Sequence, residues 1–553
     1  MKNRLTQVHI RNFRAIAGPV DINLAPITIL YGPNSAGKSA VYGVIDLVGR
    51  LCSHGDATFQ DNEDLLRAMR NHDYTQTMTI GLSGKFYEFD YCRTNNSGQI
   101  AEFARTLEEN LPRLAWYLFQ RTQQMNQPHR ENNPIDIRVD WSVNYLDERW
   151  DSGAGRLHET RRGPCAYPVE ISINGALLAT ITRDTLKFNL IHPVIAIANK
   201  DLQDHSESLP SLIERLFGPD PEAIRMHENT LSVSLWHYFD NGFLDLQGGL
   251  PGNPTTADQI LLLLARTVIR ALIMVPLQYI ASSALDFTHI GPVRKMPTDK
   301  DLTFLSASPD GDSFEIYADL SHSEWSWRDG GQAWKELADS RYNQSLITLV
   351  NDWLNAPQRL NLKHRICVSH SDVRKPGTDH CNQIAASGQR PASTVPDRIT
   401  FINLHEDGLN EQVSVSNVGA GIPQLVPVLT AGFLKEQIFI EQPELHLHPS
   451  LQTEIADYFI SRYNSAETSF VIESHSEFLA LRLLRRIRET SVADIRHREF
   501  QLEPDQVAFY YFNPTTEGTN IVHLRVSAEG EFIDRWPRGF FAEREVELFG
   551  EDD

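Results

Sequence analysis

The sequence has few cysteines, and they do not form pairs. Five cysteines are scattered over 553 residues: Cys52, Cys92, Cys165, Cys367 and Cys381. An odd, dispersed set excludes a disulfide framework and favours free thiols in a reducing compartment. The opening MKNRLTQVHIRNF also lacks the apolar core of a signal peptide. We therefore expect a cytoplasmic protein.

A long apolar run without charges is also missing. The most hydrophobic segment, 260–277, carries Arg266 and Arg270 and contains Pro276. Charges are expensive inside a bilayer, so this segment is interpreted as a buried helix that the proline breaks. We expect no membrane partner.

Positive charge and heptad repeats are scarce as well. Lys and Arg total 51 against 72 Asp and Glu, a net charge of −21. This balance excludes a protein that coats nucleic acid with its whole surface and leaves only a local basic patch for such contacts. Without heptads, long coiled-coil arms are not expected. The length predicts two or three domains.

One segment matches a phosphate-binding loop. It fits G-x-x-x-x-G-K-[ST] and consists of Gly32, Pro33, Asn34, Ser35, Ala36, Gly37, Lys38 and Ser39. An apolar strand at 27–31 precedes it and a helix at 40–48 follows, which is the order that the motif needs. A glycine-rich turn that matches by chance is the alternative. The sequence predicts a site for ATP or GTP.

The residue types explain this prediction. The two glycines permit backbone conformations in which successive N–H groups converge on phosphate oxygens at a helix N-terminus. The ammonium group of Lys38 would lie between the β- and γ-phosphates, and the hydroxyl of Ser39 would ligate Mg²⁺.

A magnesium site of this kind also needs an acid at the end of another buried strand. The run QIFIEQ at 437–442 supplies Glu441, which we expect to reach Mg²⁺ directly or through water. A further apolar strand at 469–472 leads into E-S-H-S, where His475 is placed to sense a γ-phosphate.

A second glycine-rich turn, SNVGAGIPQ at 416–424, opens a helix at 424–434. Its candidate anion-binding residues are Ser416, Gly419 and Gly421. One nucleotide cannot use both glycine loops as its main cradle. We therefore expect the second turn to serve a nucleotide that another subunit holds.

Other interpretations of these side chains stay open. A catalytic metal cluster would use Glu441, Glu444, His446 and His448. A zinc site of non-standard spacing would use Cys367, His370, His380 and Cys381.

Basic and amide side chains leave further alternatives. A helix with Arg482, Arg485, Arg486 and Arg488 would contact DNA or a partner, or form a solvated face paired with Glu477 and Glu489. Gln60 is a candidate for a glutamine that senses magnesium.

The rest of the chain divides by pattern. Short alternating runs between 77 and about 189 predict an antiparallel β lobe with a helical stretch at 103–127 and a hairpin turn at Asn174-Gly175. Residues from about 195 to 285 are predicted to be mainly helical. Residues 300–395 are predicted to be irregular except for a helix at 345–354.

The order of the motifs resembles a known group of ATPases. The phosphate loop, glycine-rich helix start, acidic strand end with its P-E-L-H-L-H-P tail, and E-S-H-S are similar to the ABC-type, AAA-family heads of chromosome-structuring and DNA-repair proteins. The chain is most similar to ATPases of bacterial antiphage systems, the overcoming-lysogenization-defect and Septu-like families. I-R-N-F-R at 10–14, H-I-G-P-V-R at 289–294 and W-P-x-G-F-F at 536–541 add to this resemblance.

The resemblance implies an α/β fold, a P-loop ATPase head with a mixed sheet core, flanking helices, an antiparallel β lobe and a large, mainly helical insertion. The expected parts are 1–93 with the phosphate loop, 94–285 with the β lobe and insertion, 286–397 as a connecting region, and 398–553 with the remaining motifs. It also implies a head-to-tail homodimer, or a higher oligomer, that sandwiches two ATP molecules with Mg²⁺.

Two positions depart from the pattern. Gln442 stands where these heads place a glutamate that polarises the attacking water, and an amide cannot accept that proton. Glu444 or His475 would substitute, or hydrolysis is slow. Pro423 replaces a common serine, which weakens a side-chain contact to the partner's nucleotide and leaves the N–H groups of Gly419 and Gly421 in place.

These features lead to a ranked set of functions. Because only residues 476–553 follow His475, the metal-binding nuclease domain of the overcoming-lysogenization-defect enzymes is not expected. The leading hypothesis is therefore a regulatory ATPase of an antiphage system that controls a separate nuclease, of the HNH type. The alternatives are a DNA-repair or chromosome-associated ATPase that binds DNA directly, and the ATP-binding subunit of a transporter.

Overall fold

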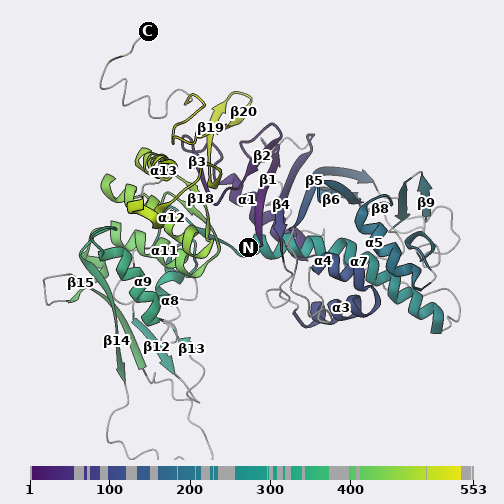
Figure 1. Ribbon diagram of the computed structural model, residues 1–553, viewed down its shortest axis with the longest axis horizontal. Helices are drawn as coiled ribbons and strands as arrows, with labels where there is room; N and C mark the ends of the chain where they lie inside the picture. The colour runs from purple at the N-terminus through teal and green to yellow at the C-terminus, as the bar shows by residue number, and fades with distance from the viewer. Residues whose placement is uncertain are drawn as a thin grey trace, which may run out of the picture. The chain divides into compact units, whose positions relative to one another are not determined.

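The chain forms two compact units in the computed structural model (Figure 1). The first contains Met1–Ala25, Gly32–Phe287 and Tyr510–His523, and the second contains Pro26–Tyr31, Thr288–Phe509 and Leu524–Asp553. The structure describes residues 3–54, 68–70, 75–87, 97–119, 134–149, 160–182, 185–205, 207–212, 224–227, 229–234, 256–295, 297, 303–307, 315–317, 325–338, 343–372, 398–406, 412–492, 495–536 and 550.

A nine-stranded sheet organises the first unit, and every pair of neighbouring strands in it is antiparallel. Its order is β2-β1-β4-β5-β6-β7-β8-β10-β9. The strands are β1 Arg4–Arg11, β2 Val20–Asn23, β4 Met78–Phe86, β5 Ile135–Arg149, β6 Thr160–Ile173, β7 Ala176–Ile181, β8 Thr185–Asn189, β9 Ile224–His227 and β10 Thr230–Ser234. The predicted antiparallel lobe is confirmed. So is its hairpin, where Asn174 and Gly175 have φ of 51° and 77° as a two-residue turn requires.

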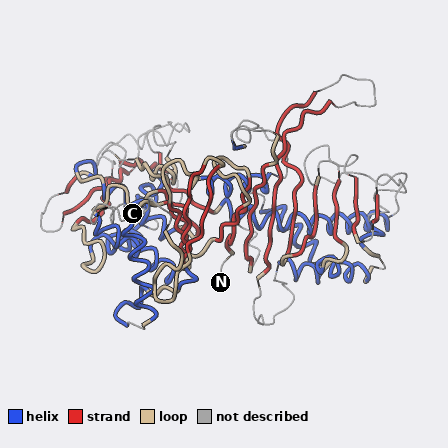
Figure 2. The backbone as a smooth tube through the Cα atoms, turned by 90° about the horizontal axis from the view of Figure 1, so that it is seen from above, coloured by secondary structure: helices blue, strands red, loops and turns tan. Residues whose placement is uncertain are grey.

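Helices line this sheet (Figure 2). They are α1 Ala40–His54, α3 Ser97–Asn110, α4 Pro112–Phe119, α5 Pro193–Gln203 and α7 Thr256–Leu285. The long helix α7 packs closely on α1, since a Cβ at Gly49 would lie 2.9 Å from the Cβ of Ala284.

Helix α7 corrects one prediction and confirms another. It continues through Pro276 to Leu285, so the proline does not break it. Proline costs one backbone hydrogen bond, but Val275 and Leu277 on either side are 2% exposed, and this burial outweighs the loss. Of the described helices, Leu263–Leu285 is long and apolar enough to cross a membrane by length and composition. Its most apolar window is 72% buried, as predicted for a core helix.

One segment of the first unit differs from the predicted pattern. The region from 195 to 285 was expected to be mainly helical, yet β9 and β10 lie within it because β10 finds a partner in β8 (Leu231 opposite Phe188). The strand predicted at 27–31 is confirmed, and it is separate from β2 because Pro26 interrupts the run and the two strands join different sheets.

A six-stranded sheet with the order β11-β17-β18-β3-β19-β20 supplies the parallel strands of the second unit. The strands are β3 Ile27–Tyr31, β11 Phe287–Ile290, β17 Gln437–Glu441, β18 Ser469–Glu473, β19 Val507–Thr515 and β20 Gly518–Leu524. Strands β17, β18 and β3 are parallel, with Glu441 opposite Glu473 and Glu473 opposite Leu30. Their carboxyl ends therefore share one edge, and the phosphate loop begins at the residue after Tyr31.

A third sheet occupies part of the region predicted to be irregular. Its order is β13-β12-β15-β14, with β16 paired to β15. The strands are β12 Thr303–Ala307, β13 Glu315–Tyr317, β14 His364–Asp372, β15 Arg398–Glu406 and β16 Gln412–Val413. The prediction of irregular structure is wrong for β12, β13 and β14, because partners distant in sequence, such as Val368 and Ile402, complete the ladder.

Helices complete the second unit. They are α8 Gly331–Ala338, α9 Asn343–Asn355, α11 Gly421–Leu434, α12 Pro449–Ala466 and α13 Glu477–Ser491, with short 3₁₀ turns at Val415–Asn417, Ile495–Phe500 and Pro504–Gln506. The helices predicted at 345–354 and 424–434 are confirmed as α9 and α11. Helix α11 starts at the second glycine-rich turn, and α12 and α13 each follow the end of a parallel strand.

Candidate nucleotide site

The phosphate loop has the backbone that its sequence predicts. Gly32 and Gly37 have φ of 142° and 94°, in the range that favours glycine, and Ser35 also has a positive φ of 63°. Lys38 is 2% exposed, and its ammonium group donates to the carbonyls of Gly32 (2.8 Å) and Pro33 (2.9 Å). The backbone of the loop therefore surrounds the ammonium group of its own lysine.

Strands β19 and β20 support this loop inside the first unit. A Cβ at Gly32 would lie 2.5 Å from the carbonyl oxygen of Phe512, so only glycine fits there. The hydroxyl of Thr519 donates to the carbonyl of Ala36 (2.8 Å). The residues fit a triphosphate, because a buried ammonium group stands behind an exposed rim that runs from Pro33 to Ser35.

The second unit carries the predicted acid. The side chain of Glu441 ends β17 and is 14% exposed. The Nε2–H of His289 donates to its Oε1 at 2.7 Å, and the imidazole ring packs edge-on against Phe439 with centroids 5.6 Å apart. One carboxylate oxygen is thus oriented by a neighbour, as is usual for metal-ligating carboxylates.

Backbone contacts fix the residue after the acid. Gln442 has a φ of 48°, and its N–H donates to the carbonyl of Glu473 at 2.7 Å. The guanidinium of Arg294 donates to the carbonyls of Glu441 (2.7 Å) and Gln442 (3.4 Å). Burial lowers the pKa of Arg294 to about 10, although the carboxylates of Glu444 and Glu441 oppose this shift.

Glu444 joins two turns at this edge. Its Oε1 accepts the backbone N–H of His475 at 2.7 Å. Burial raises the pKa of Glu444, and the hydrogen bond from His475 partly offsets the rise. The sequence offered Glu444 and His475 as substitutes for a missing base, and the structure brings the two residues together.

Gln452 makes a second link between the same turns. Its amide donates to the carbonyl of Leu447 (3.0 Å) and accepts from the hydroxyl of Ser476 (2.6 Å), which also caps α13 through the N–H of Leu479. The end of the neighbouring strand β3 also bonds to these turns, because the hydroxyl of Tyr31 donates to the carbonyl of Ser476 at 2.9 Å.

The second glycine-rich turn has a different character. Gly419 is exposed, and a Cβ there would meet no atom within 4 Å. The hydroxyl of Ser414 accepts the N–H of Ser416 and lies 2.7 Å from the Ser416 hydroxyl, on an exposed surface. Helix α11 begins at Gly421 with no side-chain cap from Ala420, and the N–H groups of Ile422 and Gln424 donate to the carbonyls of Gly419 (3.4 Å) and Ala420 (3.1 Å).

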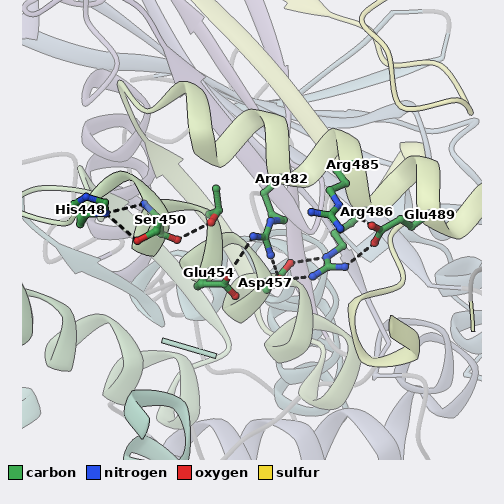
Figure 3. Close-up of polar contacts among 9 residues, drawn as sticks. His448, Ser450, Glu454, Asp457, Arg482, Arg485, Arg486 and Glu489 are labelled. Carbon is green, nitrogen blue, oxygen red and sulfur yellow. Dashed lines mark hydrogen bonds and ion pairs between the residues drawn. The ribbon is translucent and has the colours of Figure 1, made fainter. Parts of the chain in front are cut away.

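Ion pairs hold α12 against α13 beneath these turns (Figure 3). Asp457 is 1% exposed and accepts from Arg482 (2.5 Å) and from two nitrogens of Arg486 (2.6 and 2.8 Å). Glu489 accepts from Arg485 and Arg486, and Glu454 accepts from Arg482. The arginine-rich helix therefore has partners on α12 that the sequence pattern did not indicate, and Arg486 is buried rather than solvated.

The alternative sites do not assemble in the part of the chain that the structure describes. No group of three His, Cys, Asp or Glu residues there is placed to hold a metal ion. His448 instead caps α12 by accepting the N–H of Ser450, and His446 is exposed. Cys367 lies in β14 with its thiol free, whereas His380, Cys381 and Gln60 fall outside the described residues.

A family model described as an AAA ATPase domain matches residues 335–480, the stretch that contains α11, the acidic strand end and His475. The phosphate loop precedes this stretch in the chain. The chain is a P-loop ATPase of the α/β class. A second model, described as a protein of unknown function (DUF3696), matches residues 502–549 of this ATPase.

Solved structures add a distant likeness. The head domain of the Smc protein from Thermotoga maritima is 10% identical, and the match covers 95% of this chain and 100% of that one, with a TM-score of 0.34. The Smc head from Pyrococcus furiosus, bound to the C-terminal domain of ScpA, is 8% identical over 95% and 96% of the two chains, also with a TM-score of 0.34. The search of curated proteins gave no match.

Sequence reasoning missed the residues that hold the acidic edge in place. His289 and Arg294 belong to the H-I-G-P-V-R run, which the sequence marked by resemblance but without a role. Their contacts to Glu441 span about 150 residues of chain (separations of 152 and 147), so no local pattern reveals them. The available signal in the sequence was an arginine that closely follows a Gly-Pro turn.

Proposed function

We propose that this ATPase is an ATP-gated regulatory dimer in which each nucleotide is bound by the phosphate loop of one copy and the second glycine-rich turn of the other. The observation that carries the proposal is the contrast between the two turns. Lys38 is enclosed by the carbonyls of its own loop, while Gly419 is exposed and a Cβ there would meet no atom within 4 Å. An open anion-binding turn suits a phosphate group that arrives on a second molecule.

Within one copy, Lys38 would hold the β- and γ-phosphates and Ser39 with Glu441 would hold Mg²⁺. The metal ion would neutralise charge on the phosphate oxygens. His289 orients the Glu441 carboxylate for this task through its 2.7 Å hydrogen bond. That Lys38 and Glu441 approach one triphosphate stays a prediction.

Hydrolysis is proposed to be slow. Gln442 follows the acid and cannot accept a proton from the attacking water. Glu444 is the available carboxylate, but its Oε1 is engaged by the N–H of His475. Its present contact holds the His475 turn, so we assign it a positioning role and regard the protein as a slow timer.

The regulated activity is proposed to be a separate nuclease of an antiphage system. The support is the sequence resemblance to Septu-like ATPases, together with the absence of an acidic metal cluster among the described residues. Co-expression with the neighbouring gene product and affinity purification should recover a nuclease. Recovery of none, with phage resistance unchanged on deletion, would refute this part of the proposal.

Nucleotide binding is tested with Lys38→Ala. Loss of the ammonium group should weaken binding of a fluorescent ATP analogue by a factor of about 100 or more, given a charge-assisted contact of roughly 3 kcal/mol. Lys187→Ala, at an exposed lysine of β8, is the matched control and should bind as the wild type does.

Turnover is tested with Gln442→Glu. A carboxylate in the water-polarising position should raise kcat by about 100-fold, at the lower end of general-base effects. The backbone N–H of Gln442, and not its side chain, bonds to the carbonyl of Glu473, so the substitution should leave the turn unchanged. An unchanged rate would mean that this residue does not face the attacking water.

A further inference from the structure

A buried arginine connects the second glycine-rich turn with the acidic strand end. Arg294 is 1% exposed and lies four residues after β11. One terminal nitrogen of its guanidinium donates to the carbonyl of Gln424 in the first turn of α11 (3.2 Å), and the other donates to the carbonyl of Glu441 (2.7 Å). A single planar group thus touches both elements.

Gln424 completes the connection from the helix side. Gln424 is 4% exposed, and its side-chain amide makes two hydrogen bonds to the backbone of Arg294. The Oε1 accepts the N–H of Arg294 (3.2 Å), and the Nε2 donates to the Arg294 carbonyl (2.6 Å). The pair is therefore reciprocal, and neither residue can shift without breaking the bonds of the other.

The segment that carries Arg294 is fixed on its far side as well. The N–H of Gly291 donates to the carbonyl of Arg328 (2.8 Å), and the N–H of Lys295 donates to the carbonyl of Asp329 (2.7 Å). A Cβ at Gly330 would lie 2.8 Å from Pro427 of α11 and 3.3 Å from the Cβ of Arg294. A displacement of α11 must therefore move either Arg294 or this turn.

A charged side chain is an expensive choice for bonding carbonyl groups in the interior, since burial lowers the pKa of Arg294 to about 10. The planar fork explains the choice, because it reaches Gln424 and Glu441 together whereas the single nitrogen of lysine cannot span both. The bonds go to main-chain carbonyls, so they set the position of the backbone at the acid.

We propose that Arg294 and Gln424 form a positioning pair that couples the second glycine-rich turn to the Glu441–Gln442 strand end. When a partner's nucleotide engages the turn and shifts α11, the pair transmits the shift to the residues that hold magnesium and water in the same copy. This inference rests on the proposed dimer. It adds that the two nucleotide sites of the dimer are energetically linked inside each protomer.

The test is Arg294→Lys in the full-length protein. Its readout is the ratio of the dimer dissociation constants without and with a non-hydrolysable ATP analogue, measured by analytical ultracentrifugation. We expect this ratio to fall by roughly tenfold, within the usual range of coupling between sites. Analogue binding to the dilute monomer should stay within about threefold of the wild type, because Lys38 is untouched.

A matched control separates coupling from packing. Arg462 also donates to a carbonyl of α11, that of Gly432 at 2.9 Å, and has no bond to Glu441. Arg462→Lys should keep the wild-type ratio. Equal loss in both variants, or an unchanged ratio in Arg294→Lys, would overturn the inference.

Kinetics give a second readout that a merely structural role would not move. Arg294→Lys should lower kcat by roughly tenfold with KM within about threefold, since only the placement of Glu441 and Gln442 changes. If Arg294→Lys does not fold, Gln424→Glu carries the test. It keeps an acceptor for the Arg294 N–H but loses the bond to the Arg294 carbonyl. Wild-type protein that fails to dimerise with the analogue would instead refute the proposed function.

Discussion

The two glycine-rich turns of this ATPase are built in opposite ways. The phosphate loop is closed, with a buried lysine inside it and a backbone carbonyl of β19 2.5 Å from where a Cβ on Gly32 would lie. The second turn is open, with Ser416 exposed and with no atom within 4 Å of the corresponding position on Gly419. The same residue type therefore serves close approach in one turn and accessibility in the other.

The difference concerns how far each turn is preorganised before a ligand binds. A loop that must hold several phosphate oxygens is preorganised by its own unit, which lowers the entropic cost of binding. In the proposed dimer the second turn would receive its ligand from another molecule, and its exposed surface and the helix behind it suit that role. That helix, α11, is buried along most of its length, and Arg294 donates to the carbonyl of its residue Gln424.

The largest effect on stability is expected from removing a buried ion pair between α12 and α13. Asp457→Ala would leave Arg486, which is 5% exposed, without its main counter-charge. Removing one partner of a buried pair costs about 3–5 kcal/mol of unfolding free energy. Chemical denaturation monitored by circular dichroism measures the loss.

The exposed pair Asp46–Arg50, in which both side chains are 39% exposed, offers the control. Asp46→Ala should cost less than about 0.5 kcal/mol. Similar losses for the two aspartates would show that the α12–α13 ion pairs do not brace the second unit.

A direct comparison of the turns is the next test. Gly32→Ala combines a φ of 142° with a clash against Phe512, so we expect a loss of about 1–3 kcal/mol in stability together with lost nucleotide binding. Gly419→Ala should change stability by no more than about 0.5 kcal/mol, because open space receives the methyl group. Thermal melts of both variants decide the matter, and a larger loss at Gly419 would reverse the comparison.

A smaller effect is expected at the cap of α13. Ser476→Ala removes the acceptor for the N–H of Leu479 and the donor to Gln452. Loss of such a cap costs about 1 kcal/mol. Ser491→Ala, at an exposed serine near the other end of the helix, should leave the denaturation midpoint unchanged. If both variants behave alike, the His475 turn is not held by this hydroxyl.

The smallest effect depends on pH. Burial would raise the pKa of Glu489, but hydrogen bonds and charge from Arg485 and Arg486 hold it below its ordinary value of 4.5. The stabilisation is therefore present above pH 4.5 and is lost as the pH falls through the lowered folded value. Glu489→Gln should cost less than about 1 kcal/mol at pH 7, and the difference from wild type should vanish in acid. A difference that persists or grows in acid would contradict this origin.

Much of the site is readable from sequence because its signals are local. The spacing from Gly32 to Ser39 sets the phosphate loop, and the apolar strand before Glu441 sets the acidic edge. The role of Arg294 was not readable, because its partners Gln424 and Glu441 lie 130 and 147 residues away. The third sheet escaped prediction for the same reason, since polar strands such as β14 become recognisable only through their distant partners.

The sequence by itself determined the chemistry of this protein. It specified a phosphate-binding loop and an acid at a strand end, because each depends on residue type and short-range spacing, and the family resemblance marked Gln442 as a departure. Only the tertiary structure decided how these groups are held. His289 orients the Glu441 carboxylate through a hydrogen bond. Glu444 accepts the backbone N–H of His475, and Asp457 accepts from Arg486 of α13. Such contacts arise when the folded chain buries polar groups that must then find partners, wherever in the sequence those partners lie.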